Sequence, residues 1–223
     1  MSKIAIGYVH TGGVTEKFMR SIFNAMVEDE GKLLSGHLIG CEPANIAEAR
    51  CNVVKQFLDS TDAEWLWFID TDIIFDADTH ARLLAHADKD ERPIVSAAYW
   101  THYGDGQNLC WMVLRDDTFR PVLECPMDEP VELASIGFGC VLIHRSVLVK
   151  MREDYGKDPW PWFGNDIVRL GPGAVRIGED MTFCCRAIRS GFSVWGIGVP
   201  VKHRKVSVLE QPERELVADG IES

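Results

Sequence analysis

Two carboxylates stand one residue apart in Asp70-Thr71-Asp72, directly after the apolar run Trp65–Ile69. An apolar run of this length is typical of a parallel strand covered on both faces of its sheet. Residues two apart in an extended chain point the same way, so we expect both aspartates to project beyond the strand's carboxyl end. Open α/β sheets bind ligands there, and paired hard oxygen donors suit Mg²⁺ or Mn²⁺ shared with a phosphate. The pattern therefore indicates nucleoside-diphosphate chemistry.

The same triplet also fits an ordinary turn, because aspartate and threonine side chains readily bond nearby backbone groups. The surrounding elements must separate the two interpretations. Apolar strand patterns alternate with helical patterns: strands are expected at 3–9, 36–39, 65–69 and 93–98, and helices after Thr15, Asn45 and Asp78. This alternation is typical of a Rossmann-like, doubly wound, mostly parallel α/β sheet. It places the triplet at a ligand-binding edge.

The second half of the chain predicts a smaller, mixed β region. A hairpin is expected around 115–118, and short strands at 131–136 and 140–144 are joined through Gly137-Phe138-Gly139. A helix follows from 146 to about 154, then an irregular Pro/Trp segment at 159–163. A loop at 171–178 leads to a helix that runs from Glu179 to Ser190, and a last strand is expected at 193–197.

We interpret the chain as one α/β domain over 1–209 with a tail at 210–223. About 1–105 would form a nucleotide-binding half, and 106–209 a catalytic half. The helix after Thr15 carries Phe18, Met19, Ile22, Phe23 and Met26 at the period of an amphipathic helix that packs one face on a core. His80 and His86 are expected on a helix surface.

Composition restricts the possible partners. The 223 residues are 46% hydrophobic and 26% charged, with a formal charge of −11, and no apolar run suits a membrane span. An acidic protein repels nucleic acid and anionic membranes, so an anionic ligand needs a local cation. Seven cysteines without a Cys-x-x-Cys pair argue for reduced thiols. With no signal-peptide pattern at the N-terminus, we expect a cytoplasmic protein.

Four segments, in this order, give the chain a family resemblance. They are IAEARCNVVKQFL followed by WLWFIDTDIIF, then SIGFGCVLIHRSVL, GEDMTFCCRAIRSGFSVW, and VKH at 201–203. Together they cover about 46–203. The sequence resembles the GT-A class of nucleotide-sugar glycosyltransferases, and is similar to compact phage and bacterial members. The resemblance implies a single GT-A-like domain.

The resemblance also implies a metal site. In this class a divalent ion bridges the two phosphates of the donor to the Asp-x-Asp motif. Asp72 would be the direct ligand, Asp70 would reach the ribose or a metal-bound water, and His203 would complete the metal shell. An imidazole ligand favours Mn²⁺ over Mg²⁺. The alternative for His203, in Lys202-His203-Arg204-Lys205, is a solvated basic surface residue.

The same resemblance gives Arg50, Thr11 and Gly12 roles in nucleotide binding. A guanidinium offers phosphate oxygens a planar pair of donors, although Arg50 could instead pair with Glu48 or another acid. Thr11 and Gly12 follow the first strand, where the backbone must bend and can approach a ligand. Gly137 and Gly139 could lie beside the donor sugar, and a plain turn is the alternative there.

Glu179 and Asp180 open a helix, where acids also favourably oppose the helix dipole. They match the acidic pair that faces the acceptor in GT-A enzymes. In inverting members one such carboxylate removes the acceptor proton. We favour Asp180 as that base, with Glu179 as the substitute. In a retaining enzyme the acid would only orient the acceptor.

We therefore expect a Mn²⁺- or Mg²⁺-dependent transferase that moves a sugar from a nucleoside-diphosphate-sugar to an acceptor hydroxyl. The acceptor could be a protein, a glycan or a lipid head group. A nucleotidyltransferase is a weaker alternative, because the 10–13 turn has no nearby basic cluster for a triphosphate. A non-catalytic nucleotide- or sugar-binding module is the other alternative.

Overall fold

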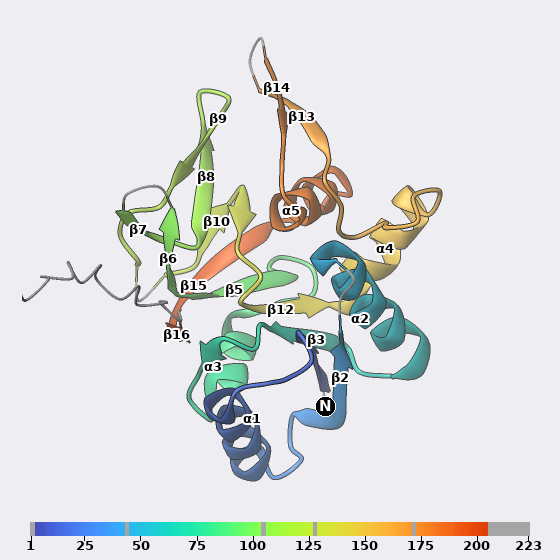
Figure 1. Cartoon of the computed structure of the whole chain (residues 1–223), viewed down its shortest axis with the longest axis vertical. Helices are drawn as coiled ribbons and strands as arrows, with labels where there is room; N and C mark the ends of the chain where they lie inside the picture. The colour runs from blue at the N-terminus through green and yellow to red at the C-terminus, as the bar shows by residue number, and fades with distance from the viewer. Residues whose placement is uncertain (1–2, 43–44, 104–105, 127–128, 171–172, 205–223) are drawn as a thin grey trace, which may run out of the picture.

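A seven-stranded sheet organises the chain, as seen in a computed structural model that describes residues 3–42, 45–103, 106–126, 129–170 and 173–204 (Figure 1). The strand order is β10-β15-β5-β12-β3-β1-β2. In that order the strands are Val131–Leu133, Val194–Pro200, Ile94–Ala98, Cys140–His144, Trp65–Ile69, Ile4–Val9 and Leu34–Cys41. The tail expected at 210–223 lies outside the described residues.

Most strands of the sheet run in one direction. β2, β1 and β3 are mutually parallel, and β5 and β15 share their direction. β12 is inserted between β3 and β5 and runs antiparallel to both, and β10 is antiparallel to β15 at the edge. The expected mostly parallel α/β sheet is confirmed, and every residue of β3 and β5 is buried, as their apolar sequences predict.

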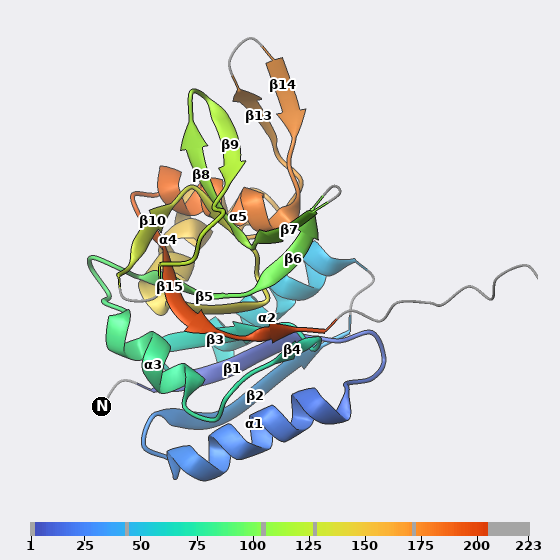
Figure 2. The same ribbon diagram turned by 90° about the vertical axis from the view of Figure 1, so that its left-hand side faces the viewer.

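Five helices cover the two faces of this sheet (Figure 2). α1 (Glu16–Asp29) and α3 (Thr79–His86) lie on one face, and α2 (Ile46–Ser60), α4 (Arg145–Tyr155) and α5 (Glu179–Arg189) lie on the other. The Thr15 hydroxyl accepts the Phe18 N–H at 3.2 Å and so caps α1 as expected. None of the described helices is both long and apolar enough to cross a membrane.

Two hairpins project from the same side of the sheet and lie near each other in both views (Figures 1 and 2). The first joins β8 (Trp111–Arg115) to β9 (Thr118–Pro121), and β11 (Ser135–Ile136) extends its sheet. The second joins β13 (Ile167–Leu170) to β14 (Gly173–Arg176). The first hairpin was expected from the sequence. The loop expected at 171–178 was wrong in part, because 173–176 forms a strand.

Two further strand pairs are short and were not expected. β4 (Ile73–Ile74) pairs with β16 (Lys202–His203), and β6 (Trp100–Tyr103) pairs with β7 (Gly106–Leu109). Both pairs lie next to the carboxyl ends of sheet strands, because β4 follows β3 and β6 follows β5 directly in the chain. They build the rim of the site described below.

The expected core face of α1 was wrong in part. Phe18 and Ile22 are buried, but Met19, Phe23 and Met26 are exposed. The apolar arc of this helix is wider than the surface that covers it. Small and polar residues occupy the rest of the buried face.

The surface position expected for His80 was also wrong. Its side chain is buried, and its Nε2 lies 3.1 Å from Oδ1 of Asp29 at the end of α1. Asp29 in turn accepts the backbone N–H groups of Leu33 and Leu34. The histidine therefore braces α3 against α1, a contact between segments 51 residues apart that local periodicity does not encode.

Candidate active site

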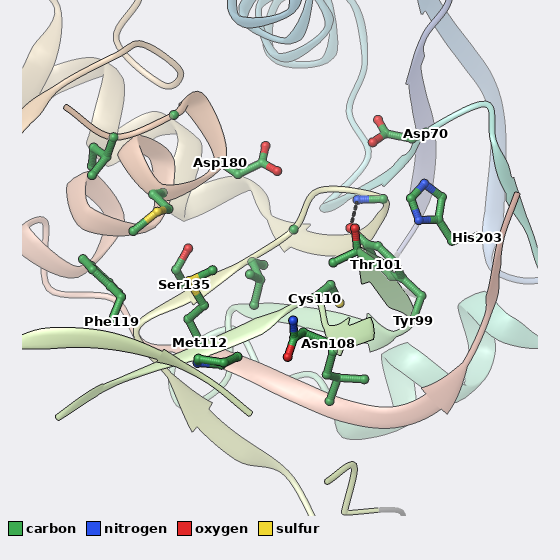
Figure 3. Close-up of a pocket in the computed structure, with 18 of the residues that line it drawn as sticks. Asp70, Tyr99, Thr101, Asn108, Cys110, Met112, Phe119, Ser135, Asp180 and His203 are labelled. Carbon is green, nitrogen blue, oxygen red and sulfur yellow. Dashed lines mark hydrogen bonds between the residues drawn. The ribbon is translucent and has the colours of Figure 1, made fainter. Parts of the chain in front are cut away.

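A cavity of about 600 Å³ opens at the carboxyl ends of β3 and β5 (Figure 3). Asp70, Asp72 and His203 line one end, and Asp180 lies across from them at the start of α5. In Figure 3 the carboxylates of Asp70 and Asp180 point toward one another across the opening. Tyr99, which follows β5, also lines the cavity. The carboxyl edge of the sheet thus gathers the acids that the sequence singled out.

Asp70 and Asp72 reach the cavity through a turn and not through extended backbone. The strand ends at Ile69, and the Ile73 N–H donates to the Asp70 carbonyl at 3.0 Å. The turn places the two side chains in different environments, because Asp70 accepts from Arg50 whereas Asp72 pairs with His203. The Thr15 hydroxyl donates to the Thr71 carbonyl at 3.5 Å.

The short β4–β16 pair brings His203 to Asp72 across 131 residues of sequence. His203 aligns with Ile73, and the Arg204 N–H donates to the Asp72 carbonyl at 2.8 Å. As a result Nε2 of His203 lies 3.0 Å from Oδ2 of Asp72. The Tyr99 ring packs edge-on against the imidazole, with centroids 5.5 Å apart. His203 is therefore a fixed member of the site and not a freely solvated residue.

The donor set beside His203 fits a divalent ion in part. Across the described residues, no three His, Cys, Asp or Glu side chains form a complete metal site. Asp72 and His203 do provide a carboxylate oxygen and an imidazole nitrogen at one point of the cavity wall. Such a mixed set suits Mn²⁺. Two protein ligands leave coordination positions for phosphate oxygens, which is how substrates usually complete the shell of a weakly held divalent ion.

Arg50 is the shared counter-ion of three acidic side chains at the cavity. It is 3% exposed, and Nη2 lies 3.1 Å from Asp70 while Nη1 lies 3.2 Å from Glu179 and also contacts Asp180. Its guanidinium rests on buried aromatic rings, at 5.3 Å from the Phe138 centroid. Burial alone would lower the pKa of Arg50, but the charges of Asp180, Asp70 and Glu179 raise it above its usual value.

Arg50 is therefore committed to protein carboxylates in this state. Its Nε is buried and has no hydrogen-bond partner among the described residues. Removing one member of a buried ion pair typically costs about 3–5 kcal/mol, because the remaining charges lose their compensation. Of the two interpretations weighed from the sequence, the geometry shows the pairing with acids. The partners are Asp70, Glu179 and Asp180, and not the sequence neighbour Glu48.

Asp180 has the properties of a proton acceptor near neutral pH. Burial raises its pKa to about 6, Glu179 and Asp70 add to that rise, and Arg50 and the Phe138 N–H oppose it. The Phe138 N–H donates to Oδ2 at 3.2 Å. Burial likewise raises the pKa of Asp70, with Arg50 opposing. Asp180 lines the cavity, whereas Glu179 is turned toward Arg50.

The segment Gly137-Phe138-Gly139 connects the two acidic ends. The Asp70 N–H donates to the Gly139 carbonyl at 2.9 Å, and the Gly139 N–H donates to the Tyr99 hydroxyl at 3.0 Å. A Cβ on Gly139 would lie 2.7 Å from Cζ of Tyr99, and one on Gly137 would collide with the hydroxyl. Both positions need glycine because the tyrosine packs directly on their backbone.

Thr11 and Gly12 lie on the exposed loop between β1 and α1. They do not belong to the described lining of the cavity. Gly12 has φ +81°, and a Cβ there would meet Glu42. The hydroxyl of Thr15, which follows this loop, contacts the Asp70–Asp72 turn. The loop is thus on the β1/β2 side of that turn, opposite the wall formed by β8, β9 and β14.

Sequence reasoning did not assign the second hairpin to the site, but it did give the segment at 99–103, which begins with Tyr99, as a candidate mobile loop near the donor. Tyr99 had a usable signal, because it directly follows a buried strand of the sheet whose carboxyl end faces the ligand edge. β14 had none, because its residues Gly173–Arg176 are all exposed and show no alternation of apolar and polar types. Trp162, in the irregular segment at 159–163, is buried and donates to the Leu148 carbonyl at 2.8 Å, so it is part of the core.

Comparison by sequence gives no family, since no protein-family profile and no curated protein matches the chain. Solved structures do match. The crystal structure of A197 from STIV aligns with a TM-score of 0.53 at 14% identity, over 95% of this chain and 99% of that one. GalNAc-T7 with UDP, GalNAc and Mn²⁺ aligns with a TM-score of 0.59 at 12% identity, over 91% of this chain and 44% of that one.

A third structure is S. aureus TarS 1-349 in complex with UDP-GlcNAc. It aligns with a TM-score of 0.54 at 12% identity, over 93% of this chain and 60% of that one. The chain thus spans less than two thirds of the GalNAc-T7 and TarS structures. At such identities the likeness concerns the fold, and it establishes a GT-A-like Rossmann fold for this chain.

Proposed function

We propose that this protein is a divalent-metal-dependent glycosyltransferase that uses a nucleoside-diphosphate-sugar donor. The observation that carries the proposal is one cavity in a GT-A-like fold that holds Asp70, Asp72 and His203 at one end and Asp180 at the other. Structures of the same fold contain UDP with Mn²⁺ and UDP-GlcNAc. A partly buried acid with a raised pKa that lines a cleft is typical of a catalytic site.

Asp72 and His203 would hold the divalent ion, and Asp70 would face the donor beside them. When bound, the ion neutralises negative charge that develops on the diphosphate leaving group. Thr11 and Gly12 would contact the nucleotide from the β1 side, and Gly137 and Gly139, which line the cavity together with Tyr99, would lie beside the donor sugar. We assign Arg50 to the positioning of Asp70 and Asp180, since its donors already serve those carboxylates.

In a direct displacement the acceptor oxygen bonds to the anomeric carbon of the sugar. The bond from that carbon to the diphosphate oxygen breaks, and its electron pair leaves with the nucleoside diphosphate. The acceptor proton moves to Asp180, or to Glu179 in its absence. The pKa of about 6 lets Asp180 be ionised at neutral pH and still accept a proton.

A thermal-shift panel tests the donor half of this proposal. The full chain is heated with UDP, GDP, CDP or dTDP, each with and without Mn²⁺, since a ligand that binds only the folded state raises its apparent stability. We expect one nucleotide to stabilise the protein in the presence of Mn²⁺ only. Hydrolysis or transfer of the matching sugar donor then separates an enzyme from a binding module.

Two variants make this test specific. Asp72→Asn and His203→Ala should abolish the Mn²⁺-dependent shift, while Asp59→Asn, an exposed residue on α2 far from the cavity lining, should keep it. Stabilisation by a nucleotide without metal, equal in all three variants, would argue against the proposed site.

A further inference from the structure

The cavity continues from Asp180 into a groove between the two projecting hairpins. Met112, Phe119 and Pro121 of the β8–β9 hairpin line one side, and Val175, Arg176 and Ile177 of the β14 segment line the other. Both views show the two hairpins extending away from the sheet as separate arms (Figures 1 and 2). An acceptor that reaches Asp180 from this side must pass between them.

Both arms offer strands with a free edge. Over the described residues, β9 pairs only with β8, and β14 pairs only with β13. β9 and β14, which both contribute residues to the groove, are therefore outer strands of their small sheets. Unpaired N–H and C=O groups on such strands are templates for another extended chain. Neither a sugar nor a lipid tail can use that row of groups in register.

The side chains of the groove are mainly apolar, and some are exposed. Val175 is 47% exposed on β14, and Leu114 and Ile167, which stand on the same two arms, are 51% and 71% exposed. Exposed apolar groups collected on projecting elements mark a surface that contacts another macromolecule. A glycan would bury its hydroxyl groups against Met112, Phe119 and Val175 with few partners, at a cost in free energy.

The charge of the arms and of the whole chain distinguishes between the remaining classes of acceptor. The β13–β14 arm carries Arg169 and Arg176 and no acid among its described residues, although the whole chain has a formal charge of −11. The arm is thus locally basic and complements an acidic segment. The net negative charge disfavours an anionic membrane surface as the place where the acceptor is met.

We propose that the acceptor is a polypeptide, bound as an extended segment between β9 and β14, with a serine or threonine hydroxyl presented to Asp180. Alternate side chains of the segment would fill the apolar groove, and an acidic residue would pair with Arg176. The inference rests on the proposed glycosyltransferase function, because it names the acceptor for that reaction. The hydroxyl of the peptide supplies the oxygen that bonds to the sugar, and its proton passes to Asp180.

A peptide array tests the acceptor without the donor. Immobilised 11-residue peptides with a central serine and systematically varied flanks are probed with the labelled full chain, without metal or nucleotide. We expect binding to peptides with Val, Ile or Leu two residues either side of the serine and with acidic ends. Backbone N-methylation of the same peptides should reduce binding at least tenfold, because it removes donors needed for strand pairing.

Matched variants locate the binding surface. Val175→Asp should weaken peptide binding at least tenfold, and Arg176→Glu should switch the preference from acidic to basic ends. Val27→Asp is the control, because Val27 is an exposed valine (59%, against 47% for Val175) on α1, which covers the other face of the sheet. Its binding should match the parent chain.

Neutral oligosaccharide arrays and phosphatidylglycerol vesicles are probed in parallel. Two results would overturn the inference. One is binding to an oligosaccharide or to the vesicles that the Val175→Asp substitution weakens. The other is a folded chain that binds no peptide. The two proposals fail separately. Donor hydrolysis without peptide binding removes only the polypeptide acceptor, and peptide binding by a chain that neither binds nor hydrolyses any nucleotide-sugar removes the proposed transferase.

Discussion

Arg50 balances only part of the negative charge at the base of the cavity. One guanidinium faces the three carboxylates of Asp70, Glu179 and Asp180. Buried carboxylates in excess of their counter-ions have raised pKa values, because each disfavours ionisation of the others. Burial and the neighbouring carboxylates raise the pKa of Asp180 to about 6. Burial, with the surplus negative charge of Glu179 and Asp70 added to it, explains how an aspartate can act as a base near neutral pH.

The acceptor step should follow the ionisation of Asp180. Only ionised Asp180 can accept the proton, so kcat/KM should fall about tenfold per pH unit below the pKa of about 6 and level off above it. A bound cation would move the acidic limb of the pH profile, where kcat/KM falls, to lower pH. Initial-rate measurements from pH 4.5 to 8 check this, and a rate that rises as pH falls would contradict it.

Asp180→Asn should reduce turnover by about 10²–10⁴-fold and leave donor binding intact. Its folded-state pKa is raised, so the proton on Asp180 stabilises the fold at low pH, and this contribution is lost as pH rises through about 6. The neutral amide keeps that contribution, so the variant should unfold at or above the parent temperature at pH 7. Glu179→Gln, which alters a residue outside the described lining of the cavity, should cost less activity.

At the scale of elements, three junctions between strands and loops form one hydrogen-bonded unit. They lie after β3, after β5 and before β12. Gly139 receives the Asp70 N–H at its carbonyl and donates its own N–H to Tyr99. The Phe138 N–H holds Asp180. Three backbone donors therefore fix the relative positions of the acids on either side of the cavity. Such support by rigid elements is what keeps a catalytic geometry.

Gly139→Ala tests that unit. The new methyl group would lie 2.7 Å from Cζ of the buried Tyr99 ring, which cannot move away without disturbing His203. We expect a loss of about 1–3 kcal/mol in the free energy of unfolding, as for other overpacked sites. Gly13→Ala is the control, since nothing lies within 4 Å of its added Cβ. Equal stability of both variants in urea unfolding would contradict the packing.

Elements with strong apolar patterns could be predicted from the sequence, but the strands with which they pair could not. The strands at β1, β3 and β5 and the helix caps at Thr15 and Asn45 follow from local residue types. The antiparallel insertion of β12 does not, because its apolar run fits either direction. Two-residue strands such as β4 and β16 are too short to carry a pattern.

The residues of the candidate site also divide into those that the sequence predicts and those that it does not. Asp70, Asp72, Asp180 and His203 were found through residue type and order along the chain, and the structure collects them in one cavity. The role of Arg50 as a shared counter-ion depends on contacts 129 and 130 residues away. Strand β14 is exposed along its whole length and is defined by its pairing with β13. Long-range pairing is what the sequence pattern lacks.

At the scale of the whole molecule, the formal charge of −11 opposes an anionic donor. Screening by salt weakens both repulsion and attraction between exposed charges. Without a divalent ion, raising NaCl from about 50 to 300 mM should therefore strengthen the weak nucleotide binding. With Mn²⁺ present, the same increase in NaCl should weaken nucleotide binding, because it screens the attraction between the ion and the acidic residues. Isothermal titration at the two salt concentrations measures both, and equal slopes would contradict the cation's role.

The most direct measurement is anomalous scattering from crystals grown with Mn²⁺ and the nucleoside diphosphate that stabilises the protein. The account predicts a manganese peak within bonding distance of Oδ2 of Asp72 and Nε2 of His203, with the diphosphate completing the shell. A bound nucleotide with no manganese peak there, and the 3.0 Å contact between Asp72 and His203 unchanged, would contradict it.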